Sequence, residues 1–233
     1  MTEAIWAELA DVRAQVMAAT ETEHSSLGEF IRHEVNERAD SPLAGIILCA
    51  SLPRKDSPAQ AAARIHLAAA MVLLDVALSL HKLLLLQAPD TDTLDKSLVG
   101  GTVLAGDYCF SQAAVAAAHT ENPQVVAIFS ELLKELSEAH LRHLFAQGQS
   151  GLDEFPALFR SGGLAGAVLA GQSDAEQAQT AGFAASLADF FGDADDSNNL
   201  HRERFSAALQ KKTAAYQHPR WLALLQRGKF NGN

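Results

Sequence analysis

The chain has 233 residues, of which 48% are hydrophobic, and this suits one domain with a substantial core. Its 28 Asp and Glu residues outnumber its 18 Lys and Arg residues and give a net charge of −10. Nucleic-acid binding depends on clustered Lys and Arg at the phosphates, and no such cluster occurs, so the composition argues against a nucleic-acid partner.

Composition predicts an all-α fold, because Ala, Leu, Gln, Glu and Lys dominate and alternating β-branched runs are almost missing. The predicted helices span residues 3–19, 25–38, 42–51, 57–87, 97–119, 123–147, 151–171, 174–191 and 201–215, with a short last turn near 219–227. No repeat or linker divides the chain. We therefore predict a single-domain helical bundle of about 8–10 helices over residues 1–227, followed by a mobile tail at 228–233.

The first segment, MTEAIWAELADVR, is amphipathic and acidic, without the basic and apolar regions of a secretion signal. Cys49 and Cys109 both lie in apolar surroundings, which is typical of core thiols in a reduced compartment and not of a disulfide or metal site. These features predict a cytoplasmic protein.

Turn and capping residues mark the helix boundaries. Asp56-Ser57-Pro58 supplies a cap and an early proline for the helix at 57–87, and Pro89 ends that helix. Asn122-Pro123 separates the next two helices, and Gly148 closes the second of them.

The segment Ile65–Leu86 is apolar nearly all round, so we expect it inside the bundle. Its longest uncharged run, Leu67–Leu74, has eight residues, whereas a membrane span needs roughly 20 apolar residues. The prediction is therefore a core helix and no transmembrane segment. The polar pair in LSLHKLLLL, His81 and Lys82, is costly on such a helix unless it is paired or faces a cavity. Asp75 is expected to pair within the bundle and not to bind metal.

The helix at 97–119 is rich in Gly and Ala at close spacing, which lets a neighbouring helix approach closely. Each glycine inside a helix costs about 1 kcal/mol relative to alanine, so the pattern indicates a specific packing contact. Two readings stay open: tight packing within the chain, and a subunit interface.

The stretch GTVLAGDYCFSQAAVAAA, preceded by ALSLHKLLLL, resembles the trans-isoprenyl diphosphate synthase family. The resemblance implies a helical bundle of the isoprenoid synthase type, in which carboxylates of an Asp-Asp-x-x-Asp motif hold Mg²⁺ against a diphosphate. Here His81 matches the family histidine, but Lys82, Leu83 and Leu86 stand at the aspartate positions. Leucine cannot ligate a metal and lysine repels it, so we expect no metal at this degenerate motif.

The other motifs of the family are also incomplete. In ERADSP, Pro42 is retained and Arg38 stands where the family has lysine, but Ser41 replaces the arginine that helps to grip isopentenyl diphosphate. The arginine pair that follows the first aspartate motif has no counterpart in QAPDTDTLDKS.

The second aspartate motif would fall in ASLADFFGDADDS. One register keeps Asp189 and Asp193 with Phe190 between them, and another uses Asp193, Asp195 and Asp196. We interpret these residues as a solvated acidic turn. The chain is thus expected to bind no cofactor and to carry no catalytic or metal-binding residue.

This pattern is similar to the small, non-catalytic component of two-component polyprenyl diphosphate synthases, above all component I of the heptaprenyl enzyme. That branch shares a TVLAGDY stretch followed by a helix of the type found at Lys134–Phe145. The resemblance implies a heterodimer with a catalytic large subunit that holds the Mg²⁺. Such enzymes, hexaprenyl or heptaprenyl, extend farnesyl diphosphate with isopentenyl diphosphate to make the side chain of menaquinone.

The resemblance also implies site residues. The expected subunit interface comprises Leu98, Val103, Leu104, Asp107, Tyr108, Ser111 and Val115, with Phe129 and Leu133 behind them. The expected wall of the tunnel for the prenyl chain of the product comprises Leu74, Ala77, Leu78 and His81, for which ordinary core packing is the alternative.

His140 and His143 have a spacing seen in zinc sites, but no further ligand pair completes one, and we interpret them as hydrogen-bonding or solvent-facing. Two other functions remain open. One is a homodimeric helical protein without an enzyme partner that either binds prenyl chains or other lipids or has a regulatory role. The other is an active single-chain prenyltransferase or terpene synthase with a metal site around Asp189–Asp196.

Overall fold

The structure is a computed structural model that describes residues 2–22, 25–38, 41–86, 96–145, 153–192 and 198–227. Within these ranges it contains ten α-helices, one short 3₁₀ helix and no strand, which confirms the all-α prediction. The α-helices are α1 (Thr2–Ala19), α2 (Ser25–Arg38), α3 (Pro42–Ala50), α4 (Pro58–Leu86), α5 (Lys96–Ala118), α6 (Pro123–Phe145), α7 (Phe155–Leu169), α8 (Asp174–Gly192), α9 (Asn198–Lys212) and α10 (His218–Arg227); the 3₁₀ helix η1 covers Ala215–Gln217. The predicted tail at 228–233 lies outside the described residues.

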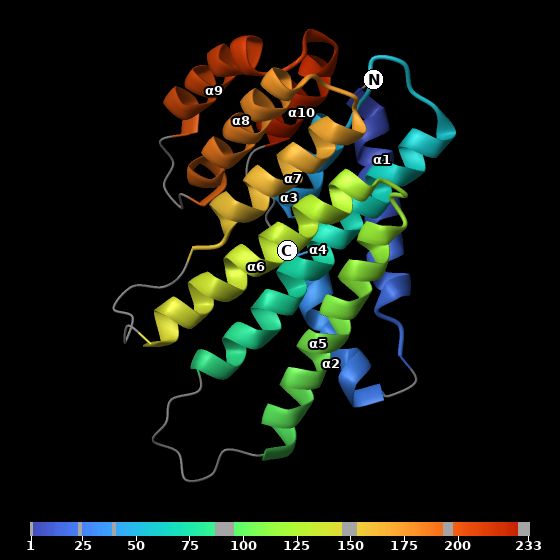
Figure 1. Ribbon diagram of the computed structural model, residues 1–233, viewed down its shortest axis with the longest axis vertical. Helices are drawn as coiled ribbons and strands as arrows, with labels where there is room; N and C mark the ends of the chain where they lie inside the picture. The colour runs from blue at the N-terminus through green and yellow to red at the C-terminus, as the bar shows by residue number, and fades with distance from the viewer. Residues whose placement is uncertain are drawn as a thin grey trace.

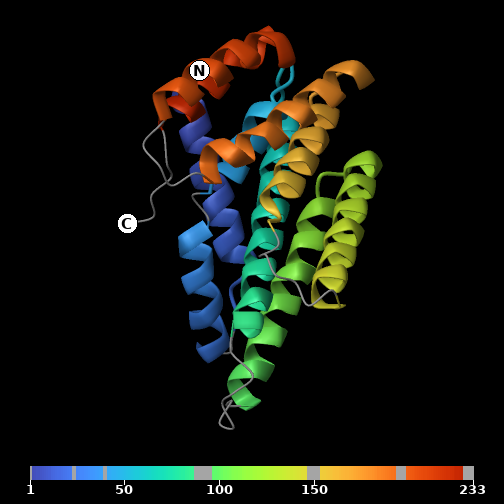
Figure 2. The same cartoon turned by 90° about the vertical axis from the view of Figure 1, so that its left-hand side faces the viewer.

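Helix α4 runs through the middle of the bundle (Figure 1). Figure 2 shows α1 and α2 on one side of it and α5 and α6 on the other, while α7 to α10 gather around its first half. Helix α5 packs chiefly against α4, and α7 packs against both α8 and α3. The long central helix is therefore the element on which any site between the outer helices is built.

Capping side chains fix where several helices begin. The Ser57 hydroxyl accepts a hydrogen bond from the Gln60 backbone N–H (3.3 Å) at the start of α4. The Asn122 side chain accepts one from the Gln124 N–H (3.0 Å) at the start of α6. Both caps satisfy backbone donors that a helix N-terminus leaves unpaired. The sequence predicted the cap of α4, and for Asn122-Pro123 it predicted the boundary between α5 and α6.

Helix α7 is shorter than predicted at its start, because it begins at Phe155 and not at residue 151. Pro156 stands in its first turn, where the ring fits the helix and no backbone N–H is needed. At the other end Gly171 adopts a φ of 68°, and its N–H donates to the Val168 carbonyl (3.0 Å), which closes the helix.

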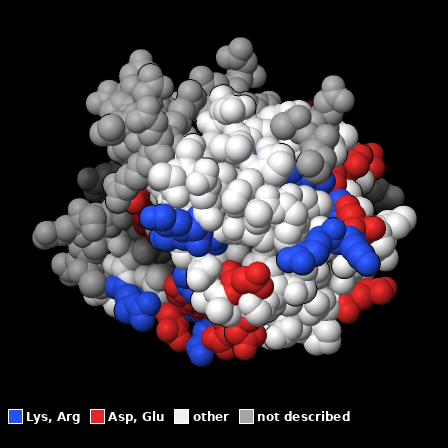
Figure 3. Space-filling view, turned by 90° about the horizontal axis from the view of Figure 1, so that it is seen from above, with Lys and Arg blue, Asp and Glu red and all other residues white. Residues whose placement is uncertain are grey.

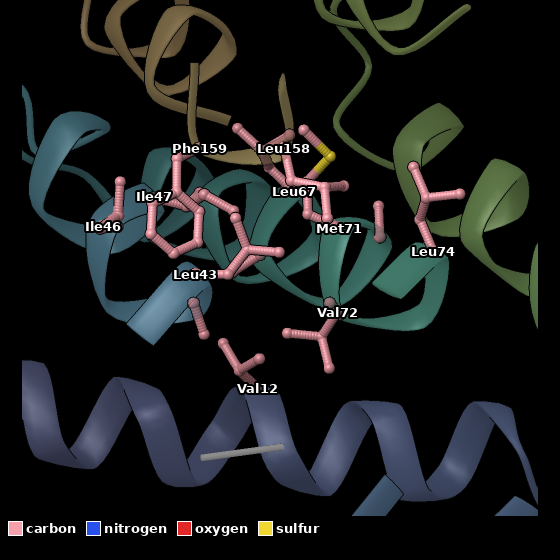
Figure 4. Close-up of a cluster of buried hydrophobic side chains, with 14 of the residues drawn as sticks. Val12, Leu43, Ile46, Ile47, Leu67, Met71, Val72, Leu74, Leu158 and Phe159 are labelled. Atoms are coloured by element: carbon pink, nitrogen blue, oxygen red, sulfur yellow. The ribbon is translucent and has the colours of Figure 1, made fainter. Parts of the chain in front are cut away.

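The hydrophobic core forms where α1, α3, α4 and α7 meet (Figure 4). Helix α3 is almost entirely apolar, and all its residues from Leu43 to Ala50 are buried. In Figure 4, Val12 of α1 lies below the side chains of Leu43 and Val72, and Phe159 of α7 closes the cluster from above. Burial of such a cluster is the main favourable term that holds the helices together.

Helix α4 is long and apolar enough to cross a membrane over Pro58–Leu83, with a mean hydropathy of 1.7 in its most apolar window. However, 72% of that window is buried inside the bundle. A core helix passes the same test of length and composition, and its burial supports the prediction of a core helix.

A cluster of ion pairs joins α1, α4 and α10, and we call Glu8, Asp56, Arg64 and Arg220 the terminal ion cluster. Arg64 Nη2 lies 2.6 Å from Glu8 Oε1 and 2.7 Å from Asp56 Oδ2. Arg220 Nη1 lies 2.5 Å from Glu8 Oε2. Because both guanidinium groups are almost completely buried, each depends on these carboxylates for its counter-ion.

Both cysteines are buried and unpaired, as predicted for core thiols. Burial raises the pKa of Cys109 to about 12 and the pKa of Cys49 well above its usual value. Neither thiol is therefore a reactive thiolate near neutral pH. The face shown in Figure 3 carries acidic and basic side chains intermixed, without a basic field that would suit a phosphate backbone.

Candidate functional site

The polar residues of α4 form one stripe on an otherwise apolar helix. Asp75, Ser79 and Lys82 follow a spacing of four and three residues, which places them on one face over two turns. The side chain of Asp75 is 5% exposed and that of Lys82 is 38% exposed. The stripe therefore runs from the interior of the bundle towards its surface.

Asp75 is paired with Arg38 at the end of α2. Arg38 Nη1 lies 3.2 Å from both Asp75 carboxylate oxygens, and Arg38 Nη2 donates to the Ser79 hydroxyl at 2.7 Å. That hydroxyl in turn donates to Glu34 Oε2 at 2.8 Å. The prediction that Asp75 pairs within the bundle is thus confirmed. Arg38, which stands at a position of the diphosphate-binding motif of the resembling family, is paired with an internal carboxylate.

Charge and burial oppose each other at this pair. Burial raises the pKa of Asp75, and this effect exceeds the lowering caused by the nearby Arg38 guanidinium. For Arg38, burial would lower the pKa, but Asp75 and Glu34 outweigh it and raise the pKa. The arginine is therefore stabilised as a cation, while the buried carboxylate retains part of its desolvation cost.

Lys82 and His140 hold the two oxygens of Glu154, the residue that precedes α7. Lys82 Nζ contacts Glu154 Oε2, and His140 Nε2 of α6 lies 2.5 Å from Glu154 Oε1. The Glu154 side chain is only 4% exposed, so its charge depends on these partners. We call Arg38, Asp75, Lys82 and Glu154 the site ion cluster.

His81 lies against a glycine of α5. A Cβ atom added at Gly106 would come within 2.2 Å of His81 Nε2, so the imidazole occupies the space that any larger residue at 106 would need. The same nitrogen lies 3.4 Å from Asp107 Oδ1. Gly106, in the LAGDY stretch, therefore allows the imidazole to lie between α4 and α5.

A cavity of about 220 Å³ opens beside His81, between α4, α5 and α6. Its apolar wall is formed by Leu74, Leu78, Phe110, Leu133 and Leu136, and its polar residues are His81, Asp107, Ser137 and His140. Small-molecule pockets usually measure about 300–1,000 Å³, so this cavity suits only a short segment of a long chain.

The structure places three of the four predicted tunnel residues, Leu74, Leu78 and His81, on the wall of this cavity. Ala77 is fully buried and does not line this cavity, so its place in the tunnel wall stays a prediction beside the alternative of ordinary core packing. Sequence reasoning missed the α6 side. Leu133, Leu136, Ser137 and His140 share one face at helical spacing, and that spacing was the available signal.

Helix α5 presents an unusual apolar face to solvent. Val103, Leu104 and Val115 are 37%, 64% and 49% exposed, and Asp107 and Ser111 on the same face are also exposed. The opposite face of α5, formed by residues such as Ala105, Ala113 and Ala117, is buried in the bundle. The small residues on that buried face are therefore explained by packing within the chain.

Three of the residues predicted for the interface contact other parts of the same chain. The half-exposed Tyr108 donates its hydroxyl to the backbone carbonyl oxygens of Ala19 and Glu21, each at 3.2 Å, and its role in an interface stays a prediction. Phe129 is 4% exposed and Leu133 lines the cavity, so both lie inside the bundle, behind the outer face of α5.

Some predicted residues lie outside the described set. These are the side chains of Leu86 and Leu98, together with Asp193, Asp195 and Asp196. Asp189, at the end of α8, is exposed. Leu83 is partly buried and packs against the core. The two registers of the second aspartate motif therefore remain predictions.

The described residues do not fit a magnesium ion at the degenerate motif. Mg²⁺ requires oxygen ligands in near-octahedral geometry, whereas Lys82 and Leu83 offer none. Asp75 and Glu154 already have Arg38, Lys82 and His140 as partners. Across the described ranges no group of three or more His, Cys, Asp or Glu side chains could hold a metal, and His140 is bound to Glu154.

Comparison with known proteins identifies the architecture. No protein-family model matches the chain, and no curated protein matches it. The decaprenyl diphosphate synthase from Rhodobacter capsulatus has a TM-score of 0.70 at 17% identity, over 97% of this chain and 96% of that chain. The polyprenyl synthase from Caulobacter crescentus, solved with calcium and isoprenyl diphosphate, has a TM-score of 0.64 at 16% identity, over 94% of each chain.

A heteromeric enzyme shares the same architecture. A deletion mutant of the heterotetrameric geranyl pyrophosphate synthase of mint, solved with ligands, has a TM-score of 0.58 at 13% identity, over 97% of this chain and 99% of that chain. The chain therefore has the all-α fold of trans-prenyl diphosphate synthases. Fold alone does not carry function across such distances, so function has to come from the site.

Proposed function

We propose that this chain is the non-catalytic small subunit of a heteromeric trans-polyprenyl diphosphate synthase. The observation that carries the proposal is Lys82. It stands where the family resemblance expects the first metal-binding aspartate, and its ammonium group contacts the buried Glu154. A cation fixed at this point repels a divalent metal and leaves no ligand for it.

The exposed face of α5 supports a partner chain. Val103, Leu104 and Val115 expose apolar side chains on one face of the helix, and an apolar patch of this kind often marks a protein–protein contact. The mint enzyme shows that this fold occurs in heteromeric synthases. The partner we propose is a catalytic large subunit that holds the Mg²⁺ and both diphosphates.

The cavity between α4, α5 and α6 supplies part of the wall for the growing prenyl chain. A lengthening hydrocarbon gains about 0.8 kcal/mol for each methylene removed from water, and leucine side chains offer that surface. Because the cavity holds about 220 Å³, the partner has to provide the remainder of the tunnel. The proposed product is a hexaprenyl or heptaprenyl diphosphate for the side chain of menaquinone, made in the cytoplasm.

Co-expression with the large subunit from the same cell tests the proposal. The wild-type chain is expected to co-purify with it, and Val103→Arg is expected to abolish the complex, because a buried unpaired charge opposes association. Leu222→Arg is the matched control, since Leu222 and Val103 are each 37% exposed but Leu222 lies on α10. Unchanged co-purification of Val103→Arg would refute the interface on α5.

A second function is favoured by the combination of cavity and apolar face. A homodimer could cover the same α5 face and bind prenyl chains or other lipids without an enzyme partner. Native mass analysis separates the two proposals, because a homodimer forms from the purified chain alone. A single-chain synthase would instead turn over an allylic diphosphate without a partner.

A further inference from the structure

We infer that His66 of α4 and His119, the residue that follows α5, form an exchangeable binding site for a zinc ion. The inference goes beyond the proposed function, because it names a second ligand at another place in the fold. From residue 66 to residue 82, α4 rises by about 24 Å, and neither histidine lines the cavity. The pair therefore stands apart from Lys82 and from the degenerate motif.

The antiparallel packing of α4 and α5 brings the two histidines together. His81 meets Gly106 near the middle of α5, and His66 meets His119 where α5 ends. The two imidazole rings have centroids 5.2 Å apart and planes at 72° to each other. Zinc–nitrogen bonds measure about 2.0–2.1 Å and the coordination is tetrahedral, so two rings that share one zinc ion have centroids roughly 5 Å apart. The observed spacing therefore suits two imidazole ligands of one ion.

Both histidines stand on fixed backbone. His66 is half-buried on the central helix of the bundle. The His119 backbone N–H donates to the Val115 carbonyl at 3.1 Å, and the Thr120 hydroxyl donates to the Ala117 carbonyl at 2.7 Å. A metal site requires ligands that are held close to their binding geometry, and these contacts provide such support.

Gln15 of α1 contacts the other side of the His66 ring. Its side-chain amide lies against His66 Nδ1, so this nitrogen already has a partner within the chain. A histidine that binds a metal almost always donates its second ring N–H to an oxygen acceptor. A half-turn of the Gln15 amide presents its carbonyl oxygen to Nδ1–H, which leaves the lone pair of Nε2 for the metal. The contact with α1 can therefore set the tautomer that a zinc ligand needs.

The ligand set selects the class of metal. Across the described residues His81 and His140 each have a carboxylate partner, whereas no ion pair involves His66 or His119. Imidazole nitrogens suit zinc and similar transition metals, while Mg²⁺ prefers oxygen ligands.

Water has to complete the coordination of the ion. No described group offers three or more His, Cys, Asp or Glu ligands, and the exposed His119 leaves the ion accessible to solvent. Structural zinc sites are closed by four protein ligands, so a site with two is open and its ion exchanges. Zinc bound here joins the central helix to the end of α5.

Zinc titration of the untagged, metal-free, full-length chain tests the inference by calorimetry and thermal unfolding. One equivalent of Zn²⁺ is expected to bind and to raise the melting temperature, because the two rings lie together only in the folded state. Mg²⁺ at the same concentration is expected to do neither. Absence of zinc binding, or an equal rise with Mg²⁺, would overturn the inference.

His119→Asn removes one ligand at an exposed position and is expected to weaken zinc binding by about tenfold or more, since loss of a residue that only orients a ligand already costs that much. Gln15→Leu is such a loss and is expected to weaken it by about tenfold. His33→Asn, at an exposed histidine of α2, is the matched control. Equal zinc affinity of His119→Asn and His33→Asn would refute the site.

Nuclear magnetic resonance of the wild-type chain locates the ion without any substitution. The ring nitrogens of His66 and His119 are expected to shift together as Zn²⁺ is added. Shifts confined to other histidines would place the ion elsewhere and refute the pair as its ligands. Failure of the chain to associate with a large subunit would refute the proposed function and leave these outcomes untouched.

Discussion

The terminal ion cluster and the site ion cluster both bring basic side chains against carboxylates inside the bundle, but they differ in exposure and in their effect on the acids. The Arg64 and Arg220 side chains are 2% and 6% exposed, whereas Arg38 and Lys82 are 29% and 38% exposed. In the terminal cluster the pKa of Glu8 is lowered, while at the site the pKa of Asp75 is raised.

The difference lies in how the acids are paired. Burial alone would raise the pKa of Glu8, but hydrogen bonds from Arg220 and Arg64 outweigh it. Asp75 has the single guanidinium of Arg38, and its neighbour Glu154 opposes its charge further. The terminal cluster therefore stabilises the contact between the two ends of the chain. The site ion cluster instead holds buried carboxylates beside a cavity, where their desolvation costs free energy of folding.

The largest effect is expected from Glu8→Ala, which leaves two buried guanidinium groups without their shared counter-ion. Loss of one partner from a buried ion pair costs about 3–5 kcal/mol. For a chain of this size the melting temperature is expected to fall by roughly 6–20 °C. Thermal unfolding followed by circular dichroism measures it, with Glu29→Ala, an exposed glutamate of α2, as the control. A fall no larger than that of the control would contradict the role given to the terminal cluster.

Lys82→Met is expected to have a smaller effect, because Lys82 is 38% exposed and solvent screens its charge. We expect a loss of about 1–2 kcal/mol in the free energy of unfolding, since Glu154 keeps only His140. Urea denaturation of Lys82→Met, Glu154→Gln and the double variant gives the coupling between the two positions. Lys134→Met is the control, on an exposed lysine of α6. Additive effects in the cycle would show that the pair is not coupled.

Alanine substitutions at two glycines of α5 test the packing around His81 by steric contact and not by charge. Gly106→Ala would bring a Cβ within 2.2 Å of His81 Nε2, so the imidazole has to move, at a cost of about 1–2 kcal/mol. Gly101→Ala meets no atom within 4 Å and is expected to stabilise the helix by up to about 1 kcal/mol. Paired thermal melts should thus show shifts of opposite sign. Stabilisation by both substitutions would exclude the close contact with His81.

The smallest expected effect is a difference in pH dependence between the clusters, of about 1 kcal/mol. Glu8 has a lowered pKa, so the stability it contributes is present above its unfolded pKa and is lost as the pH falls through its folded value. Asp75 has a raised pKa, so its contribution is fully present below its unfolded pKa and is lost as the pH rises through its folded value.

As the pH falls from about 7 to about 3, the free energy of unfolding of the wild type should therefore decrease relative to that of Glu8→Gln. Over the same range it should increase relative to that of Asp75→Asn. Urea denaturation of the three proteins at each pH measures both differences in the free energy of unfolding. If both differences in the free energy of unfolding changed in the same direction with pH, the opposite pKa shifts described for Glu8 and Asp75 would be contradicted.

The sequence predicted the fold where local patterns decide it. The apolar pattern of α4, the cap at Ser57 and the helix boundary at Asn122-Pro123 depend on neighbours a few residues away, and these predictions are confirmed. The ion pairs were not predictable in the same way. Lys82 pairs with Glu154, and Glu8 pairs with Arg220. Each pair joins residues that are far apart in the sequence, and no periodicity links such distant positions.

The candidate site was predictable only on one helix at a time. The spacing of Leu74, Leu78 and His81 marks one face of α4, and the structure brings that face to the cavity. Which face of α6 completes the cavity depends on the packing of α4, α5 and α6 together. The position of Tyr108, turned towards the end of α1, likewise follows from a contact between distant helices.

The central claim is that side chains of this protein, with Lys82 foremost, occupy the place at which a synthase of this fold would need acidic metal ligands. The most direct measurement is the incorporation of isopentenyl diphosphate into longer products by the purified chain, with geranyl or farnesyl diphosphate and Mg²⁺. The account predicts no product from the chain alone and product once the large subunit is added. Elongated prenyl diphosphates made by the chain alone would contradict it.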